Sequence, residues 1–257
     1  MPEIQHQVDL SEAFFSELES TASMRMVFMD IVISNSSTLF QAFSHDKALL
    51  SKLKEAMKLK TVDQNALFRG LFIQAVAIFE DFIRNMVTHV VHSHQSQRER
   101  YSELSTSLQN YFISSSGNVL KYYGSGSVNG VKYDFSHLKK SLISCLSDNN
   151  DFYLEPRVFT ISMGNCTSTR VENLFSKLCL SDNIFDKIGG NQNLKNIIQE
   201  LRKSNASVLI KEKLDSIIDT RNDIAHGELT RSISKDEFDD AILFLRGLIK
   251  AFADCCV

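Results

Sequence analysis

Apolar residues recur every three or four positions along several long stretches of the chain. The strongest pattern runs from about residue 65 to 92, where one broad face carries Phe72, Ala75, Val76, Phe79, Phe82, Ile83 and Met86. This spacing is that of an amphipathic helix. Similar patterns cover residues 207–226 and 234–254. The sequence therefore predicts three long core helices.

Signals for helix ends lie between these stretches. Gly227 is suited to end the second core helix, and Ser234 with Glu237 forms a capping-box pattern at the start of the third. Ser168 or Thr169 is placed to cap a shorter helix. Because a short connection joins the second and third core helices, we expect them to pack antiparallel and to form a bundle with the first.

Weaker helical patterns precede and separate the core helices. Residues 11–35 and 45–60 are expected to form N-terminal helices, and Thr61-Val62-Asp63 is expected to separate them from the core. Residues 170–179 and 193–203 are expected to form two shorter helices.

Residues 94–165 have a different composition. Ser114-Ser115-Ser116-Gly117 indicates a loop, Asn129-Gly130 is a hairpin-type turn, and 137–146 indicates a short helix. We expect this region to be a loop-rich insertion with a short β-hairpin. The whole chain, residues 1–257, is then expected to be one all-α helical bundle that carries this insertion.

Composition narrows the classes of function. Of 257 residues, 43% are hydrophobic, which allows a sizeable core, and the formal net charge is -3. Nucleic-acid binding would therefore need a local basic patch. The chain has no apolar run of about 18 residues and no secretory signal pattern, so we expect no membrane association. Its five scattered cysteines, none in a CxxC motif, are typical of a reducing compartment, and we expect a cytoplasmic protein.

One charged residue interrupts an apolar helix face. On a helix at residues 210–225, Arg221 falls among the isoleucines, and Asp215, Asp219, Asn222 and His226 form a polar stripe beside that face. Burying an unpaired guanidinium is very costly. The position of Arg221 therefore indicates either a buried partner or a functional role.

Three segments of the sequence resemble the HEPN superfamily. The first is Arg221-Asn222-Asp223-Ile224-Ala225-His226-Gly227, which matches an Arg, four to six residues, His motif. The second is residues 67–82, a helix with Glu80 in an apolar run, and the third is Asn165 followed by a spacer and a short helix to Phe175. The resemblance is greatest to bacterial stand-alone HEPN nucleases of the RiboL-PSP-HEPN group.

The resemblance implies a metal-independent RNA endonuclease that acts as a homodimer and needs no cofactor. It implies Arg221, His226 and Asn222 as catalytic residues, with Glu80 and Asp219 in support. Relatives serve as toxins or as effectors in antiviral defence against phage, so an inhibitory antitoxin or a defence-system protein is an expected partner.

The residue types suit this chemistry. Attack of the RNA 2′-hydroxyl on its own phosphate, which leaves a 2′,3′-cyclic phosphate, needs proton transfer and stabilisation of phosphate charge. His226 can transfer protons near neutral pH, and Arg221 can bind the phosphate in a bidentate manner. Residues five positions apart lie about 140° apart around a helix, so Arg221 and its own His226 do not converge. A two-fold axis past this face would bring two copies of each into one cleft.

Other interpretations remain open at this stage. Arg221 could form a structural ion pair with Glu80 or Asp215, while His226 complements the helix C-terminus. The domain would then be a non-catalytic HEPN module that binds RNA, a nucleotide or a protein. A metal site at His89, His92 and His94 lacks nearby residues that would complete its ligand set.

Overall fold

The computed structural model describes residues 2–34, 36–42, 45–58, 60–147, 150–161, 163–178, 180, 183–227 and 231–256. Within these residues the chain forms twelve α-helices, two 3-10 turns and one two-stranded hairpin. The all-α fold class predicted from the sequence is thereby confirmed.

The elements follow one another along the chain with short connections. In order they are α1 (Pro2–Ser34), α2 (Ser36–Ala42), α3 (Lys47–Lys58), α4 (Lys60–Ser96), η1 (Tyr101–Glu103), α5 (Thr106–Leu120), η2 (Tyr123–Ser125), β1 (Ser127–Val128), β2 (Val131–Lys132), α6 (Phe135–Leu146), α7 (Arg157–Thr160), α8 (Ser168–Lys177), α9 (Ile184–Ile188), α10 (Gln192–Ile198), α11 (Lys203–Ala225) and α12 (Lys235–Cys256).

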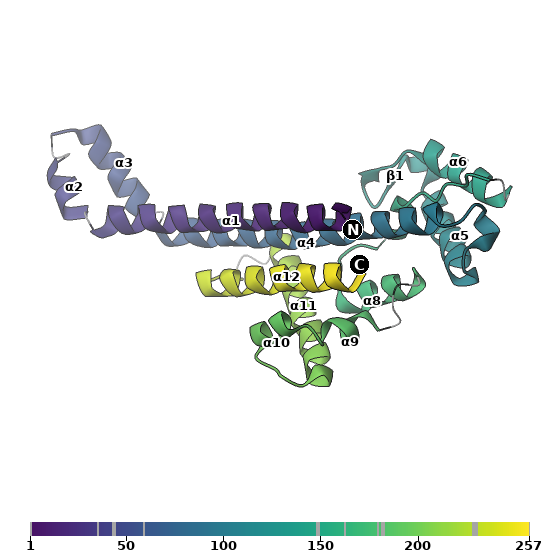
Figure 1. Cartoon of the computed structure of the whole chain (residues 1–257). Helices are drawn as coiled ribbons and strands as arrows, with labels where there is room; N and C mark the ends of the chain where they lie inside the picture. Colours follow the sequence, from purple (N-terminus) through teal and green to yellow (C-terminus); the bar gives the residue numbers. More distant parts are fainter. Residues whose placement is uncertain are drawn as a thin grey trace.

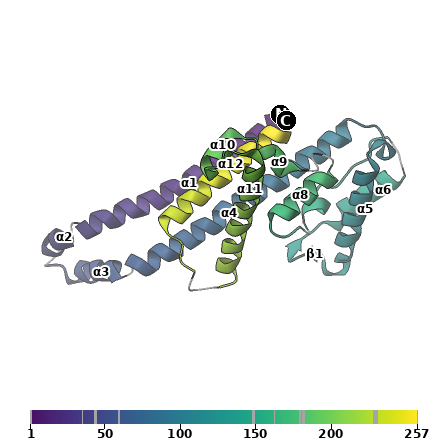
Figure 2. The ribbon, with the colours of Figure 1, turned by 90° about the horizontal axis from the view of Figure 1, so that it is seen from below.

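A long rod made of α1, α4 and α12 is the centre of the molecule (Figures 1 and 2). The predicted apolar faces of α4 and α12 are buried in it, including Phe79 and Phe252, whose rings lie 6.3 Å apart. α4 is longer than the pattern predicted, because residues 61–63 continue the helix and do not break it. Thr, Val and Asp lower helix propensity only slightly, so packing of a long helix can override them.

α11 does not pack antiparallel beside α12, so that expectation was wrong. α12 packs along α1 and α4, whereas α11 crosses the rod at a steep angle (Figures 1 and 2). The helices α9 and α10 contact both α11 and α12, and α11 also meets α12 directly through the ion pair between Lys213 and Asp240 at 2.8 Å. The single helix expected at 193–203 is interrupted, since Gln199 adopts a left-handed conformation with φ 56°.

Residues 94–165 form a lobe at the far end of α4 that contains α5, the hairpin and α6 (Figure 1). The hairpin turn is confirmed: Asn129 and Gly130 have φ of 50° and 80°, as a type I′ turn requires, and β1 pairs with β2 antiparallel. The loop predicted at residues 114–117 lies inside α5 instead, where Ser115 and Ser116 are buried. Packing of the lobe around aromatic side chains such as Phe112 overrides the local serine signal.

The segment that follows the lobe returns along α4 and positions the site. The backbone N–H of Leu154 donates to Gln95 Oε1 (3.3 Å), and the N–H of Cys166 donates to Glu80 Oε1 (3.4 Å). Residues 154–166 therefore run antiparallel to α4, from the lobe back to the middle of the rod. They end beside the first turn of α8, where α11 also passes.

Candidate functional site

Arg221 lies at the meeting point of α4, α11 and the segment before α8. Its Nη2 lies 3.2 Å from Glu80 Oε2, and its Nη1 donates to Asn165 Oδ1 (2.9 Å) and to Asn222 Oδ1 (3.1 Å). The Arg221 side chain is 22% exposed. Three side chains therefore fix the orientation of the guanidinium on a side chain that is partly exposed, although its Nε is buried and has no hydrogen-bond partner among the described residues.

Glu80 is the acidic group of the cluster and is almost completely buried, with its side chain 4% exposed. Its Oε2 is shared between Arg221 and Arg84, which lies one turn later in α4 at 3.6 Å. Its Oε1 accepts the N–H of Cys166. A buried carboxylate requires this kind of compensation, because leaving it unpaired costs several kcal/mol.

Asn165 connects the cluster, and residue patterns alone did not identify it as a site residue. Besides accepting from Arg221, it donates through Nδ2 to Asn222 Oδ1 (2.8 Å), and its backbone carbonyl accepts from Arg170 Nη1 (3.3 Å). Gly164 before it has φ +67°, and a Cβ there would lie 2.9 Å from Arg170 Nη1. The signal that could have identified Asn165 was its place in the Asn, spacer, short-helix element.

Asp215 does not pair with Arg221, although its place on the polar stripe suggested it. Its carboxylate accepts the backbone N–H of Ser168 (2.7 Å) and the Ser168 hydroxyl (2.6 Å). Asp215 thus accepts a hydrogen bond from a backbone N–H in the first turn of α8, where the side chain of the N-cap residue Thr167 makes no capping hydrogen bond. The expected cap by Ser168 or Thr169 is therefore replaced by a carboxylate from α11.

His226 and Asp219 stand apart from this cluster. Both are exposed, and among the described residues no hydrogen bond or ion pair joins either to Arg221. His226 is the C-cap of α11, and its backbone N–H donates to Asn222 O (2.8 Å). One copy of the chain therefore brings together Arg221, Asn222 and Glu80 of the predicted residues, and the exposed imidazole lies at the end of the same helix without a hydrogen bond to this cluster among the described residues.

Charge in the cluster is unbalanced toward the positive. The Cys166 thiol is buried there, and its pKa is raised to about 12, first by burial and then by the charge of Glu80. The guanidiniums of Arg84, Arg170 and Arg221 act on the same thiol in the opposite direction. Three permanent cations and one carboxylate thus act on this thiol, and a thiol with so high a pKa is no nucleophile at neutral pH.

The sequence matches the profile of the RiboL-PSP-HEPN family over residues 41–257. The chain belongs to this family. No curated protein and no solved structure matches it closely enough to add a named relative. Ribonucleases are common among HEPN proteins, and the match includes every residue of the Arg221 cluster and His226.

The HEPN region thus begins near the end of α2, and α1 lies outside it. α1 nevertheless packs along α4 and α12, where Arg246 holds Glu12 at 3.1 Å and Glu19 at 3.0 Å. None of the described helices has both the length and the apolar character needed to cross a membrane.

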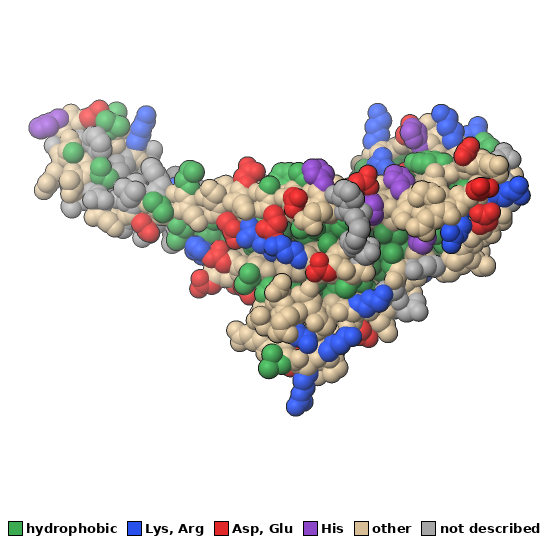
Figure 3. All heavy atoms as spheres, viewed as in Figure 1, with side chains coloured by type: hydrophobic (Ala, Val, Ile, Leu, Met, Phe, Trp, Pro, Cys, Tyr) green, Lys and Arg blue, Asp and Glu red, His purple; other side chains and the backbone are tan. Residues whose placement is uncertain are grey.

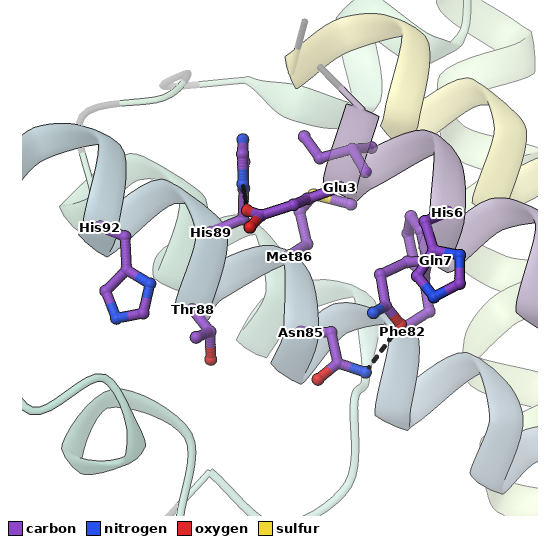
Figure 4. Close-up of a pocket in the computed structure, with 10 residues that line it drawn as sticks. Glu3, His6, Gln7, Phe82, Asn85, Met86, Thr88, His89 and His92 are labelled. Carbon is purple, nitrogen blue, oxygen red and sulfur yellow. Dashed lines mark hydrogen bonds and ion pairs between the residues drawn. The ribbon is translucent and has the colours of Figure 1, made fainter.

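A separate hollow lies between α1 and α4 of this HEPN protein, with a volume of about 350 Å³ (Figure 4). His89 Nδ1 lies 2.8 Å from Glu3 Oε2 there, and Asn85 donates to Gln7. His94 points elsewhere, with Nε2 2.9 Å from Leu178 O. In the part of the chain that the structure describes, no three His, Cys, Asp or Glu side chains are grouped to hold a metal ion.

Proposed function

We propose that this HEPN protein is a metal-independent RNA endonuclease whose active site is shared by two copies of the chain. The observation that carries the proposal is the Arg221 guanidinium, which Glu80 and Asn165 hold in one orientation while 22% of the side chain stays exposed. A preorganised guanidinium on a partly exposed side chain is suited to bind a phosphate and the charge that develops on it.

The cleavage step follows from the residue types. His226 takes the proton of the RNA 2′-hydroxyl, the O2′–P bond forms, the P–O5′ bond breaks, and the leaving O5′ takes a proton from water, while His226 returns its proton to solvent. The products are a 2′,3′-cyclic phosphate and a 5′-hydroxyl. Arg221 stabilises the negative charge on the non-bridging oxygens during this step. The Asn222 side chain, whose Oδ1 is occupied by Arg221 and Asn165, has its NH₂ group left to donate to a phosphate oxygen.

The shared site is supported by the separation of Arg221 and His226 within one chain. The two residues are five positions apart, and the imidazole makes no described contact with the Arg221 cluster. A two-fold axis near the C-terminal end of α11 would place His226 of each copy against the Arg221 cluster of the other. A homodimer would thus complete what one copy lacks.

The test is cleavage of single-stranded RNA in the presence of EDTA. His226→Ala removes an exposed side chain, so we expect stability to change by less than about 0.5 kcal/mol and cleavage to fall by roughly 100-fold or more. His45→Ala, which also removes an exposed imidazole, is the matched control and should cleave at the wild-type rate. Equal cleavage by both variants would refute the role of His226.

Mixing two inactive variants tests the shared site. In a mixed dimer of Arg221→Ala and His226→Ala chains, one of the two sites receives an intact Arg221 from one copy and an intact His226 from the other. Random pairing would restore about a quarter of the wild-type sites. No recovery, in a sample shown by sedimentation to contain dimers, would place both residues in one chain.

A role as a toxin or as an effector of antiviral defence belongs to the same proposal and is supported by the family alone. Such an enzyme needs control by an inhibitory protein or by a defence partner. Expression of wild-type and His226→Ala protein in bacteria tests this role, because only the wild type should slow growth and produce new RNA ends.

The second candidate is a non-catalytic HEPN module that binds RNA, a nucleotide or a protein partner. The Arg221–Glu80 ion pair at 3.2 Å favours it, since this pair also joins α11 to α4. RNA binding without cleavage by dimeric wild-type protein would favour this candidate over the nuclease.

A further inference from the structure

The positive charge of the cluster extends beyond Arg221. Arg84 is 43% exposed although it lies 3.6 Å from Glu80, and Arg170 is exposed and touches the cluster through the backbone carbonyl of Asn165. Arg84 shares Glu80 Oε2 with Arg221, and among the described residues no carboxylate forms an ion pair with Arg170. The exposed parts of Arg84 and Arg170 can therefore attract anions from solvent.

A groove continues from these arginines along α4. It has a volume of about 530 Å³, lies between α4 and the lobe, and is lined by Thr88 and His92 from α4 and by Tyr133, His137, Tyr153 and Arg157 from the other side. Thr88 lies one turn after Arg84, and its hydroxyl donates to the Arg84 carbonyl (3.1 Å). Glu155, Pro156 and Arg157 form part of the opposite wall, and the described residues between them and Asn165 follow α4 back toward Glu80.

Arg157 is the basic residue of the groove. Its guanidinium lies over the Tyr133 ring, 5.3 Å from the centroid, and the residue is exposed. An arginine supported in this way presents one face and several N–H donors to a ligand. It offers both a stacking surface for a base and a contact for a phosphate.

The acidic residues in the groove are occupied. Glu155 is buried and accepts from the Arg157 N–H (3.2 Å) and from the Tyr153 hydroxyl (3.3 Å). Asp134 caps α6 by accepting the Ser136 N–H (2.9 Å) and lies 3.5 Å from His137. Figure 3 shows histidine side chains gathered where the rod meets the lobe, near this groove. The contacts of Asp134 leave its side chain 62% exposed, and apart from these two acidic residues the described lining is cationic, imidazole or aromatic, with Thr88 and Pro156.

We propose that Arg84, Arg170 and Arg157 bind the backbone of single-stranded RNA along α4, between the groove and the phosphate held by Arg221. The inference rests on the proposed function, because it takes the Arg221 site as the place of cleavage. Glu80 and Gln95 mark the two ends of the antiparallel contact, and on a helix they are roughly 22 Å apart. A strand of several nucleotides can follow that length.

Binding of a labelled single-stranded RNA of about 12 nucleotides to full-length His226→Ala protein tests the inference, because this background does not cut the probe. We expect Arg84→Ala, Arg170→Ala and Arg157→Ala each to weaken binding about fivefold at low salt. Each should also lower the slope of log Kd against log salt by about 0.7 for every phosphate that the variant no longer neutralises.

Arg202→Ala is the matched control, since Arg202 is exposed at the opposite end of α11, roughly 28 Å from Arg221 along the helix. It should leave both affinity and salt slope unchanged. Arg84→Lys keeps the charge beside Glu80 and should bind RNA within about twofold of the parent, which separates the loss of charge from local unfolding. Parent-like binding by all three alanine variants would overturn the inference.

RNA length separates the groove from the cleavage site. With a probe of about four nucleotides, Arg84→Ala should still weaken binding, whereas Arg157→Ala should have no effect. An equal effect of Arg157→Ala on both probes would overturn the path. If wild-type protein fails to cut RNA while the three variants weaken binding as expected, the RNA path stands and the proposed nuclease function fails.

Discussion

Arg221 on α11 and Arg246 on α12 are almost equally exposed, at 22% and 20%, but their charge surroundings differ. Arg246 contacts two carboxylates, Glu12 and Glu19, and Lys250 also pairs with Glu12 at 2.8 Å. Two cations thus meet two anions where α12 joins α1. Around Arg221, the carboxylate of Glu80 is shared by two arginines, Arg221 and Arg84, and Arg170 contacts the backbone carbonyl of Asn165 without an ion pair to a carboxylate among the described residues.

The difference separates a structural arginine from one available to a ligand. In a group with equal numbers of cations and anions, carboxylates occupy the donors, and an added anion gives little further stabilisation. An unbalanced group is stabilised by an anion that arrives from solvent, and a phosphodiester is such an anion. Exposure alone would not have separated these two residues, whereas the balance of charge around each does.

The largest expected difference is in RNA cleavage. Arg221→Lys keeps the positive charge but loses the planar fork, and we expect kcat/KM to fall roughly 100-fold. Arg246→Lys should stay within about twofold of wild type, because its ion pairs tolerate a point charge. Rates are measured on labelled RNA with EDTA present, after circular dichroism confirms folding. An equal loss in both variants would remove the distinction between the two groups.

The second difference concerns stability. Double-mutant cycles on Glu80 with Arg221, and on Glu19 with Arg246, measure the two couplings in urea denaturation. For the buried pair we expect a coupling of about 2 kcal/mol, since each single variant leaves a buried charge. For the more exposed pair we expect about 0.5 kcal/mol. Equal couplings would contradict the assignment of Glu80 as the buried anchor of the cluster.

The sequence predicted those parts of the fold in which local pattern and packing agree. The apolar face of α4, the hairpin turn at Asn129-Gly130 and the capping box at Ser234 were all confirmed, the last by reciprocal hydrogen bonds of 3.1 and 2.9 Å with Glu237. It failed where packing overrides local signals, as in α5 at residues 114–117. It also could not foresee that α11 crosses the rod and packs on α4 and α9 more than along α12 (Figure 1).

The candidate site also has some residues that the sequence predicted and others that only the structure identified. Arg221 stood out because a charge interrupted an apolar face, and Glu80 was named as one of its two candidate partners. Choosing Glu80 over Asp215 required the three-dimensional structure, because Asp215 is used by the N-terminus of α8. Asn165 does not belong to a periodic apolar pattern. Its role depends on a turn that places it beside α11.

Arg221 and Arg246 can also be compared through their uncharged partners, Asn165 and Ser16. Asn165→Ala removes the amide that orients Arg221, and we expect cleavage to fall about tenfold and stability to fall by about 1 kcal/mol. Ser16→Ala removes the neutral partner of Arg246, whose Nη2 donates to Ser16 Oγ at 3.2 Å. It should leave cleavage unchanged and lower stability by less than about 0.5 kcal/mol. Wild-type cleavage by Asn165→Ala would show that Glu80 and Asn222 are sufficient to position the guanidinium.

The smallest expected effect comes from a carboxylate at the surface, which contrasts with buried Glu80. The backbone N–H of Ser234 lowers the pKa of Glu237 below its usual value of 4.5, and the Ser234 hydroxyl and Arg231 act in the same direction. Because the pKa of Glu237 is lower in the folded state, its contribution is fully present above pH 4.5 and is lost as pH falls through the folded pKa.

Glu237→Ala should therefore destabilise the protein at pH 7 by no more than about 0.5 kcal/mol, because solvent screens an exposed group. The difference from wild type should shrink toward pH 3, where the carboxyl group is protonated in both states. Urea midpoints at several pH values measure this change, and Glu212→Ala on α11 serves as an exposed control. A difference that stays constant with pH would mean that Glu237 stabilises α12 by contacts that do not depend on its charge. Glu237 would then act as a neutral partner, as Ser16 does, and not as a charged one, as Glu80 does.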